Sequence, residues 1–410
     1  MGLSFFKIKK EKFLALDIGT EAVKVLIYSL SNQEKIRKQQ EKRFSVLASS
    51  IQYFDKYGPF KERDFNDELI RKTVFKAMEN AYQDFILFSE KGKRNFKEDW
   101  KKWKISLSLP PTVFKGRISR QVIKRNNPKT IISRKEKNYF LERIIEETKK
   151  EIAQRFSRES GILSRDISWV CQKIIEIKID GYLVPKLQGY KGKYLEFKVL
   201  STFLPRYYFC HLKKIFEKSH LKISKIVHIA ENLPSLWKDK KINGLFLDVG
   251  GEFTQIFLVK TGLLEEINEF GVGGKIFSQK LSETLGIEEN LARELKERYA
   301  QKLLSKETSE RIEEMFLQEK REWHENLKTK IKEMVFPELS PPDIFLFGGG
   351  SLLPEIQRVL KENKNVEFLS GPTFNRNELN FVYPKSFENI DDLTKKLKGP
   401  QSVPSLLLIS

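Results

Sequence analysis

Three short segments, far apart in the chain, each join an apolar run to a glycine turn, and they constrain the fold more than any other feature. They span residues 13–20, 245–254 and 344–351. In the first two, the apolar run leads to Asp-x-Gly and then to a hydroxyl residue. Such a run predicts a buried strand that carries an aspartate to its end, and the glycines let backbone N–H groups approach a phosphate. Two copies of the pattern, with a closing triple glycine, predict a nucleotide cleft between two related halves.

The two aspartates indicate a magnesium site, and the glycines indicate a phosphate site. We predict that Asp17 and Asp248 lie opposite each other and hold a hydrated Mg²⁺ through water, because this ion keeps much of its hydration shell. The triple glycine would let the backbone pass close to the adenosine of ATP. The further residues predicted to contact the nucleotide are Gly19, Thr20, Lys24, Gly250, Gly251, Thr254, Gly273, Gly274, Lys275, Gly348, Gly349, Gly350 and Ser351. The alternative is that each Asp-x-Gly is a strand-ending turn in an ordinary α/β fold.

Other nucleotide-binding and nucleophile motifs do not occur in the sequence. It contains no Gly-x-x-x-x-Gly-Lys-Ser/Thr, and no Gly-x-Gly-x-x-Gly joins a first strand to a helix with an acidic residue downstream. No serine lies in a Gly-x-Ser-x-Gly elbow. The sequence therefore argues against P-loop proteins, dinucleotide-dependent enzymes and serine hydrolases.

The composition indicates a reduced, intracellular protein. The 410 residues include two cysteines and four histidines, which excludes a disulfide framework and a cysteine-rich zinc site. The net charge of +20 favours anionic partners such as nucleic acid, acidic lipid, nucleotide or an acidic peptide. Basic residues are interspersed with glutamates, as in residues 302–332, and no RNA-binding aromatic signature stands out. We therefore expect no nucleic-acid partner.

No part of the sequence is predicted to cross a membrane. No apolar run reaches spanning length, and there is no secretory signal, so we expect a cytoplasmic protein. Residues 1–10 mix apolar and basic side chains, which is compatible with peripheral contact at the inner face of the cell membrane. The apolar segment 402–409 is too short to span a bilayer and is expected to pack on the second domain.

The pattern between the glycine turns predicts further elements. Apolar residues at helical spacing predict a helix over 67–88, and a strong amphipathic pattern predicts another over 136–156. Residues 112–205 have the mixed pattern of a separate α+β module. Residues 275–332 are mostly helical and highly charged, which suits an outer subdomain.

The three glycine segments, taken in order, resemble the actin-like ATPase superfamily and, within it, the FtsA family of bacterial cell-division proteins. Residues 112–205 lie where that family has its inserted SHS2 subdomain, and residues 175–196 look like a strand and glycine turn of that insert. Residues 273–274 together with 292–296 resemble the family's nucleoside-holding segment, which implies that Lys296 also contacts the nucleotide. The PilM family of type IV pilus proteins shares this fold and insert and is the alternative.

The resemblance implies an α/β protein with the ribonuclease H-like, two-domain actin-like fold and an inserted SHS2-type α+β subdomain. The implied first actin-like domain comprises residues 12–111 and 206–243, interrupted by the insert 112–205. The second comprises residues 244–275 and 335–410, and residues 276–334 form its helical outer subdomain.

The resemblance also implies a function, namely an ATP-binding scaffold of cell division that links FtsZ to the membrane or divisome and self-associates into filaments. The outer subdomain 276–334 would bind the acidic C-terminal tail of FtsZ. The implied cofactors are ATP and Mg²⁺. No residue stands out as a water-activating base, so hydrolysis is expected to be slow or absent, with the nucleotide shifting the populations of open and closed clefts. The alternatives are a PilM-like cytoplasmic scaffold of pilus assembly and a sugar kinase, for which no segment clearly offers a catalytic aspartate.

The sequence departs from the FtsA pattern at the second turn and in the nucleoside segment. Glu252, Phe253 and Gln255 replace the usual glycine, threonine and acid, and Arg293 stands where a glutamate is usual. A glutamate beside phosphates repels them unless it points away. The family's usual C-terminal amphipathic helix does not follow, so membrane contact is expected to need the N-terminus, a partner or a missing tail.

Overall fold

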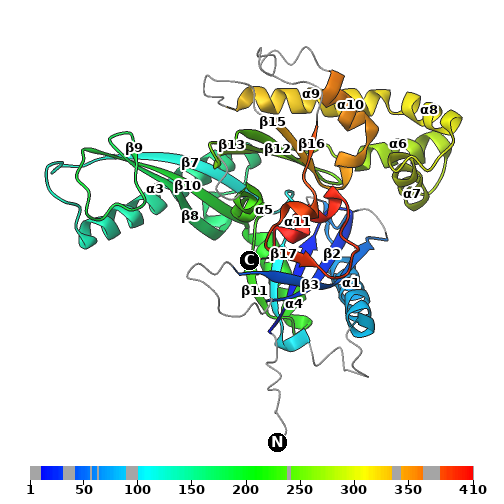
Figure 1. Cartoon of the computed structure of the whole chain (residues 1–410), viewed down its shortest axis with the longest axis horizontal. Helices are drawn as coiled ribbons and strands as arrows, with labels where there is room; N and C mark the ends of the chain where they lie inside the picture. Colours follow the sequence, from blue (N-terminus) through cyan, green and yellow to red (C-terminus); the bar gives the residue numbers. More distant parts are fainter. Residues whose placement is uncertain are drawn as a thin grey trace, which may run out of the picture.

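The computed structural model describes residues 11–30, 42–55, 58–61, 64–88, 100–237, 242–334, 343–362 and 379–409. Two large sheets lie at its centre, an inserted module projects from them on one side, and helices cover the second sheet on the other (Figure 1). Residues 1–10, on which a membrane contact was predicted, lie outside the described residues.

The first sheet has the strand order β11-β6-β1-β2-β3-β17. Strands β1, β2 and β3 form an antiparallel meander. β6 runs parallel to β1, and β11 runs parallel to β6. One face packs against α1 and α4, whose apolar residues form a core with those of the strands. The elements are β1 (Lys12–Ile18), β2 (Ala22–Leu30), β3 (Phe44–Tyr53), α1 (Asp67–Phe88), β6 (Lys104–Ser108), α4 (Arg206–Lys218), β11 (Ile223–Ile226) and β17 (Ile390–Asp392).

The second sheet repeats this topology in the order β14-β13-β12-β15-β16. Strands β12, β13 and β14 form an antiparallel meander. β15 runs parallel to β12, and β16 runs parallel to β15. The two halves therefore share one arrangement, as the repeated Asp-x-Gly pattern predicts. The strands are β12 (Gly244–Val249), β13 (Thr254–Lys260), β14 (Leu263–Phe270), β15 (Asp343–Phe347) and β16 (Asn380–Phe381).

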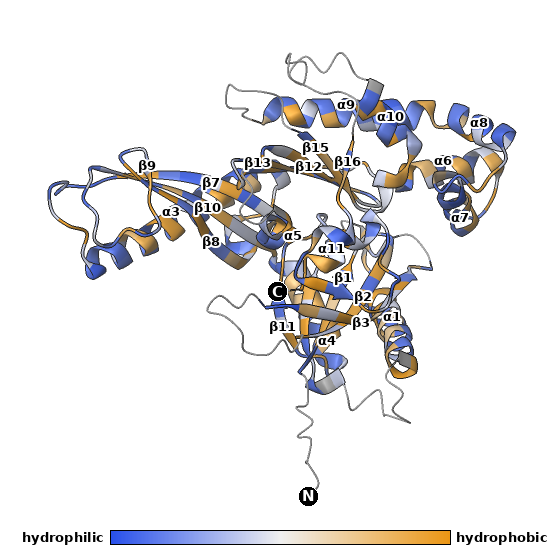
Figure 2. Ribbon diagram, in the orientation of Figure 1, coloured by the Kyte–Doolittle hydropathy of each residue, from blue (hydrophilic) through white to orange (hydrophobic). Residues whose placement is uncertain are grey.

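Amphipathic helices cover the outer face of the second sheet and share one core with it. In Figure 2, α8 and α9 carry both hydrophilic and hydrophobic residues, as expected of helices with one buried stripe. The prediction that residues 275–332 are mostly helical is confirmed. The helices are α6 (Lys275–Leu285), α7 (Glu289–Ala300), α8 (Lys306–Met315), α9 (Leu317–Glu333) and α10 (Pro354–Glu362).

The inserted module is an antiparallel sheet, in the order β7-β10-β8-β9, with one long helix on one face. The helix begins where the Ser133 hydroxyl accepts the Glu136 N–H at 3.1 Å, and it ends at Gly161, whose φ of 75° suits a residue without a side chain. The predicted helices over 67–88 and 136–156 are thus confirmed as α1 and α3. The module comprises β7 (Lys115–Lys124), α3 (Arg134–Ser160), β8 (Ile167–Ile179), β9 (Tyr182–Leu183) and β10 (Tyr194–Pro205).

The C-terminal segment connects the two halves. After β16 in the second sheet, the chain enters the first sheet as β17, and α11 (Val403–Leu406) then packs against β1 and β2. The same apolar cluster includes Phe246 and Phe257 of the second sheet. The expectation that residues 402–409 pack on the second domain was therefore incomplete. The apolar side chains of Val403 and residues 406–409 pack against both sheets.

The remaining elements are short. Within the described ranges no helix is both long enough and apolar enough to span a bilayer. These elements are β4 (Phe60–Lys61), β5 (Asp64–Phe65), α5 (Ile229–Asn232) and 3₁₀ turns at Trp100–Lys102, Ser164–Asp166, Leu233–Trp237, Gly349–Leu352, Pro384–Ser386 and Pro400–Ser402.

Candidate nucleotide site

Two turns of the same construction follow β1 and β12. In the first turn the N–H of Gly19 donates to the carbonyl of Ala22 at 2.9 Å, and in the second the N–H of Gly250 donates to the carbonyl of Phe253 at 2.8 Å. A Cβ on either glycine would lie 3.1 or 3.0 Å from that same carbonyl oxygen, closer than side chains normally approach. The repeated Asp-x-Gly motif therefore folds twice into one tight turn.

These turns and the triple glycine line a common cavity of about 210 Å³ between the two sheets. The cavity brings together most of the residues predicted to contact the nucleotide. The predicted residues that line it are Asp17, Gly19, Thr20, Lys24, Asp248, Gly250, Gly251, Gly274, Lys296, Gly348, Gly349 and Gly350.

Two glycines allow the backbone segments around the cavity to approach each other closely. A Cβ on Gly273 would lie 2.4 Å from the carbonyl oxygen of Gly251. Gly348 has φ of 84°, and a Cβ there would lie 2.3 Å from Oδ1 of Asp248. A larger residue at either position would push the second turn away from the segments that close the cavity.

Two carboxylates in the cavity share one nearby ammonium group. Lys24 Nζ lies 3.8 Å from Asp17 Oδ2 and donates to the carbonyl of Gln401 at 2.9 Å. Burial raises the pKa of Asp17, against the effect of Lys24. Burial also raises the pKa of Asp248 to about 7, with the charge of Asp17 adding to the rise and Lys24 opposing it. A further cation between the two turns would relieve this repulsion.

Two predicted hydroxyl ligands lie behind the cavity wall instead of lining it. The Thr254 hydroxyl donates to the carbonyl of Val272 at 2.8 Å and accepts from Nε1 of Trp323 at 3.0 Å. The Ser351 hydroxyl donates to the carbonyl of Gly348 at 2.7 Å. Both are buried, so they brace the site from outside.

The N–H groups of the glycine turn before α6 donate to other backbone groups of the protein. The N–H groups of Gly274 and Lys275 donate to the carbonyls of Gly250 and Gly251 at 2.9 and 2.8 Å, so they do not face a ribose or phosphate. The Lys275 ammonium forms an ion pair with Glu252 at 2.8 Å. The glutamate that departs from the family pattern is thereby neutralised and lies outside the cavity lining.

The other two departures, Phe253 and Gln255, do line the cavity, together with a histidine that the sequence analysis missed. His228 is buried, and its Nδ1 accepts the N–H of Ala230 at 3.2 Å. The ring proton is therefore assigned to Nε2, which lies 3.4 Å from the terminal amide of Gln255 and donates to that amide when its oxygen is turned toward the ring. Burial lowers the pKa of His228 to about 4, so the ring is neutral at physiological pH. The histidine lies two residues after β11, and no spacing signal in the sequence marked it.

A second missed group closes the mouth of the cavity between the first sheet and α7. The Tyr53 hydroxyl donates to Glu297 at 2.8 Å, and the Arg293 guanidinium lies 4.0 Å from the centre of the Tyr53 ring. Tyr53 and Glu297 line the cavity. Arg293, which replaces the family's usual glutamate, thus contacts the opposite half of the molecule.

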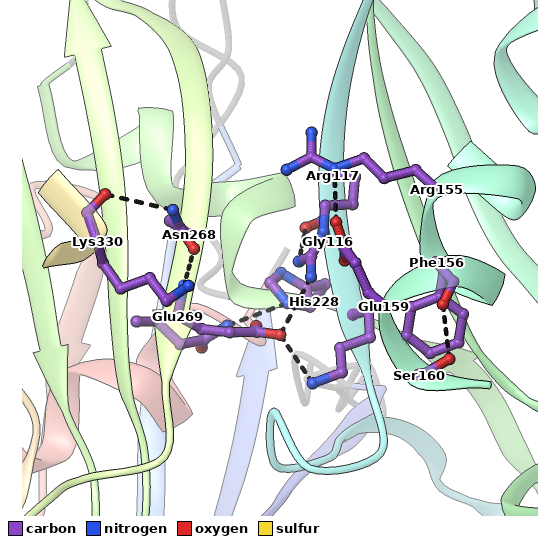
Figure 3. A network of polar contacts seen from close by, with 12 residues as sticks. Gly116, Arg117, Arg155, Phe156, Glu159, Ser160, His228, Asn268, Glu269 and Lys330 are labelled. Atoms are coloured by element: carbon purple, nitrogen blue, oxygen red, sulfur yellow. Dashed lines mark hydrogen bonds and ion pairs between the residues drawn. The ribbon is translucent and has the colours of Figure 1, made fainter. Parts of the chain in front are cut away.

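Beside His228, β7 of the module meets β14 of the second sheet, and Gly116, Arg117 and Glu269 lie around the histidine (Figure 3). A Cβ on Gly116 of β7 would lie 2.9 Å from the His228 ring, so glycine permits this approach. The Glu269 side chain of β14 is 8% exposed and pairs with Lys115 at 2.7 Å and with Arg117 at 3.4 Å. These two cations lower the pKa of Glu269 against the effect of its burial.

Comparison with known proteins identifies the fold. The structure is similar to that of a PilM–PilN type IV pilus biogenesis complex, with 14% identity, a TM-score of 0.63 and 97% of each chain covered. The chain has the two-domain actin-like fold. Weaker similarities include the ethanolamine utilization protein EutJ from Carboxydothermus hydrogenoformans (11% identity, 98% and 90% covered, TM-score 0.46). Another is MreB 5 of Spiroplasma citri bound to AMPPNP (13% identity, 93% and 94% covered, TM-score 0.43). No protein-family model and no curated protein matches the chain.

Proposed function

We propose that this chain is an ATP-binding actin-like scaffold in which the nucleotide controls the opening of the cleft. The observation that carries the proposal is the pair of equivalent Asp-x-Gly turns that line one cavity. The N–H groups of Gly19 and Gly250 are used within their turns, so a phosphate would be held by the other N–H groups of these turns, which the glycines let approach the anion closely. Tyr53 and Arg293 already contact across the cleft mouth, so a ligand inside would change the balance between open and closed forms.

A hydrated Mg²⁺ fits the two aspartates. Asp17 and Asp248 present two carboxylates to the cavity, and among the described residues Lys24 is the cation that offsets their charge. Among the described residues no group of three or more His, Cys, Asp and Glu side chains gathers as a metal cage. This favours an ion that arrives with the nucleotide and keeps its water. When bound, it would neutralise charge on the phosphates.

Rapid hydrolysis is not part of the proposal. The imidazole of His228 has its Nδ1 lone pair occupied by the Ala230 N–H and its Nε2 facing Gln255. It is therefore unavailable to deprotonate an attacking water. The nucleotide would then act mainly as a conformational ligand, with at most slow turnover.

Titration calorimetry with Mg-ATP tests the site. We expect saturable binding that Asp17→Ala and Asp248→Ala each abolish, because both carboxylates would hold the ion. Asp391→Ala is the control, since that aspartate pairs with Arg43 on the exposed edge of the first sheet. Unchanged affinity in both cleft variants would refute the assigned site.

For the finer role we propose a PilM-like scaffold of pilus assembly, supported by the similarity over 97% of both chains. Cell division is the second candidate, supported by the resemblance of the glycine segments to FtsA. Charge complementarity does not support the proposed FtsZ contact on residues 276–334. That subdomain has 12 Lys and Arg against 13 Asp and Glu, a net charge of −1, so it offers no charge complement to an acidic tail.

Two binding measurements separate these roles. In one, a labelled FtsZ C-terminal tail peptide from the same organism is titrated with the full chain and Mg-ATP, and in the other a PilN homologue replaces the peptide. The pilus role predicts saturable binding of the PilN homologue alone. Binding of the FtsZ tail alone, lost when 276–334 is deleted, would favour division. Self-association into filaments is tested by sedimentation of the full chain with and without Mg-ATP. Filaments predict that the protein pellets when Mg-ATP is present.

A further inference from the structure

The far end of the inserted module is an exposed surface with a distinctive composition. We define the distal tip as residues 122–139 and 178–196, which include β9 and the start of α3. In Figure 1 the module projects away from both main sheets, and the tip forms its outer end. The tip is therefore free to meet a large partner.

The distal tip is strongly basic. It contains ten Lys and Arg against three Asp and Glu, a net charge of +7 in a chain whose total is +20. Most of these cations are exposed, so their charge reaches the solvent. The exposed ones are Lys124, Lys129, Arg134, Lys135, Lys186, Lys191 and Lys193.

Two of the three acidic residues of the tip are engaged within it. Glu136 receives two hydrogen bonds of 2.9 Å from the buried guanidinium of Arg125. The Asp180 carboxylate accepts the backbone N–H groups of Lys193 and Tyr194 at 3.0 and 2.7 Å, and these bonds lower its pKa. The outward charge of the tip is accordingly almost entirely positive.

Large apolar side chains lie among these cations. Tyr182 and Leu183 of β9 are 78% and 65% exposed. Tyrosine has an apolar ring and a polar hydroxyl, which suits the boundary between water and lipid. The other exposed apolar side chains of the tip are Val122, Ile131, Tyr139, Tyr190 and Tyr194.

Hydrogen bonds between the loops of the distal tip fix the positions in which these apolar residues are exposed. The Arg125 guanidinium donates to the carbonyl of Gly192 at 3.0 Å, and the Ile132 N–H donates to the carbonyl of Tyr190 at 2.8 Å. Leu187 is only 1% exposed and fills the small core beneath the loop. The loops thus bury some apolar residues while holding others in solvent.

We propose that the distal tip docks on an anionic lipid surface. The cations would attract acidic headgroups, and Tyr182, Leu183 and Ile131 would enter the interfacial layer. The exposed tyrosines of the tip suit either lipid or nucleic-acid bases, but its exposed aliphatic side chains Val122, Ile131 and Leu183 gain only from the lipid environment, and they decide for lipid. A cleft that binds no nucleotide would leave this surface intact, so the docking is independent of the proposed function.

Vesicle flotation of the full chain tests the docking. We expect binding to vesicles of phosphatidylcholine mixed with phosphatidylglycerol, and none to phosphatidylcholine alone. The triple variant Lys186→Gln, Lys191→Gln, Lys193→Gln should lower partitioning by about 100-fold, since each basic residue near the surface contributes about fivefold. The matched control loses the same charge from the outer helices, with Lys306→Gln, Arg311→Gln and Arg321→Gln, and should bind like the unmodified chain.

A second variant tests the apolar contribution. Tyr182→Ser with Leu183→Ser should weaken the binding that persists in high salt, where charge attraction is screened. The proposal is overturned if neither vesicle binds, if both bind equally, or if the control triple loses as much affinity as the tip triple. It is also overturned if single-stranded RNA displaces the vesicles and binds the tip more tightly. Mg-ATP affinity, measured on the same variants, should stay constant.

Discussion

The inserted module and the outer helical subdomain both flank the central sheets, yet they differ in surface charge and in attachment. Residues 112–205 contain 21 Lys and Arg against 10 Asp and Glu, a net charge of +11. Residues 276–334 have a net charge of −1. More than half of the chain's excess charge therefore lies on the module, which makes it the surface suited to an anionic partner.

The two regions are also joined to the second sheet differently. The module is joined by largely buried ion pairs, with Glu269 facing Lys115 and Arg117, and Glu265 facing Lys198 at 2.6 Å, in addition to a shared apolar cluster that includes Leu200. The outer helices share the hydrophobic core of the sheet, with residues such as Phe277, Phe316 and Trp323. Removing one partner of a buried ion pair leaves the other charge uncompensated. We therefore expect the module's joint to be more sensitive to the loss of a single charge than the joint of the outer helices.

The largest expected effect is the loss of the module's buried ion pair. Glu269→Ala leaves the largely buried Lys115 and Arg117 side chains, 14% and 16% exposed, without their anion, and we expect a loss of up to about 3–5 kcal/mol in the free energy of unfolding. Chemical denaturation measures it. The control Glu310→Ala removes an exposed partner of Lys306 and should cost less than about 1 kcal/mol. Equal losses in the two variants would show that the joint is no stronger than a surface pair.

The joint should also make stability depend on pH through His228. Burial lowers its pKa to about 4 from 6.5. The unfolded chain therefore binds the proton at higher pH, and stability falls as the pH drops from about 6.5 to 4, by about 3 kcal/mol. The raised pKa of Asp248 acts in the opposite direction, so the comparison of unmodified chain and His228→Gln isolates the histidine. Parallel stability curves for the two proteins between pH 4 and 7 would contradict this assignment.

A smaller effect is expected where the outer helices meet the second sheet. Trp323→Phe keeps an aromatic ring but removes the hydrogen bond to Thr254 and leaves unfilled volume, which should cost about 1–3 kcal/mol. Thermal unfolding of the variant measures this cost. Since the joint is apolar, the loss should be the same in low and high salt. A strong dependence of the loss on salt would show that charge also holds this subdomain.

The smallest effect is expected at the mouth of the cleft. Arg293→Gln removes the cation over the Tyr53 ring, which should cost about 0.5–1 kcal/mol of stability and leave the fold unchanged. The same variant should open the cleft, visible as faster hydrogen exchange in α7. Arg298→Gln, from the same helix, serves as the control. No difference in exchange between the two variants would refute a closing role for Arg293.

The sequence predicted the parts of the molecule that depend on local pattern. The strands leading to Asp17 and Asp248, the long helices and the α+β module follow from periodicity and from glycine turns. Residues brought together by the tertiary fold were harder to predict. Thr254 lies in the glycine motif, yet Trp323, distant in sequence, holds its hydroxyl away from the cavity. Tyr53 lies in a different half from the helix that it contacts.

The effect of charged residues was also hard to predict from the sequence, both for the net charge of residues 276–334 and for Glu252. Basic residues are frequent in residues 276–334, but 13 Asp and Glu stand against the 12 Lys and Arg, so this subdomain offers no basic surface to an acidic tail. Glu252 looked unfavourable beside phosphates, and only the fold shows that Lys275 neutralises it. In both cases the outcome depends on pairing, which spacing along the chain does not give.

The most direct test of the cleft is a structure of the full chain crystallised with Mg²⁺ and a non-hydrolysable ATP analogue. We expect the β and γ phosphates beside the turns at Gly19 and Gly250, the metal between Asp17 and Asp248, and the adenosine near Gly349 and Lys296. An analogue bound elsewhere, or a cleft that stays empty at saturating analogue while Lys24 remains on Asp17, would contradict a nucleotide-controlled scaffold.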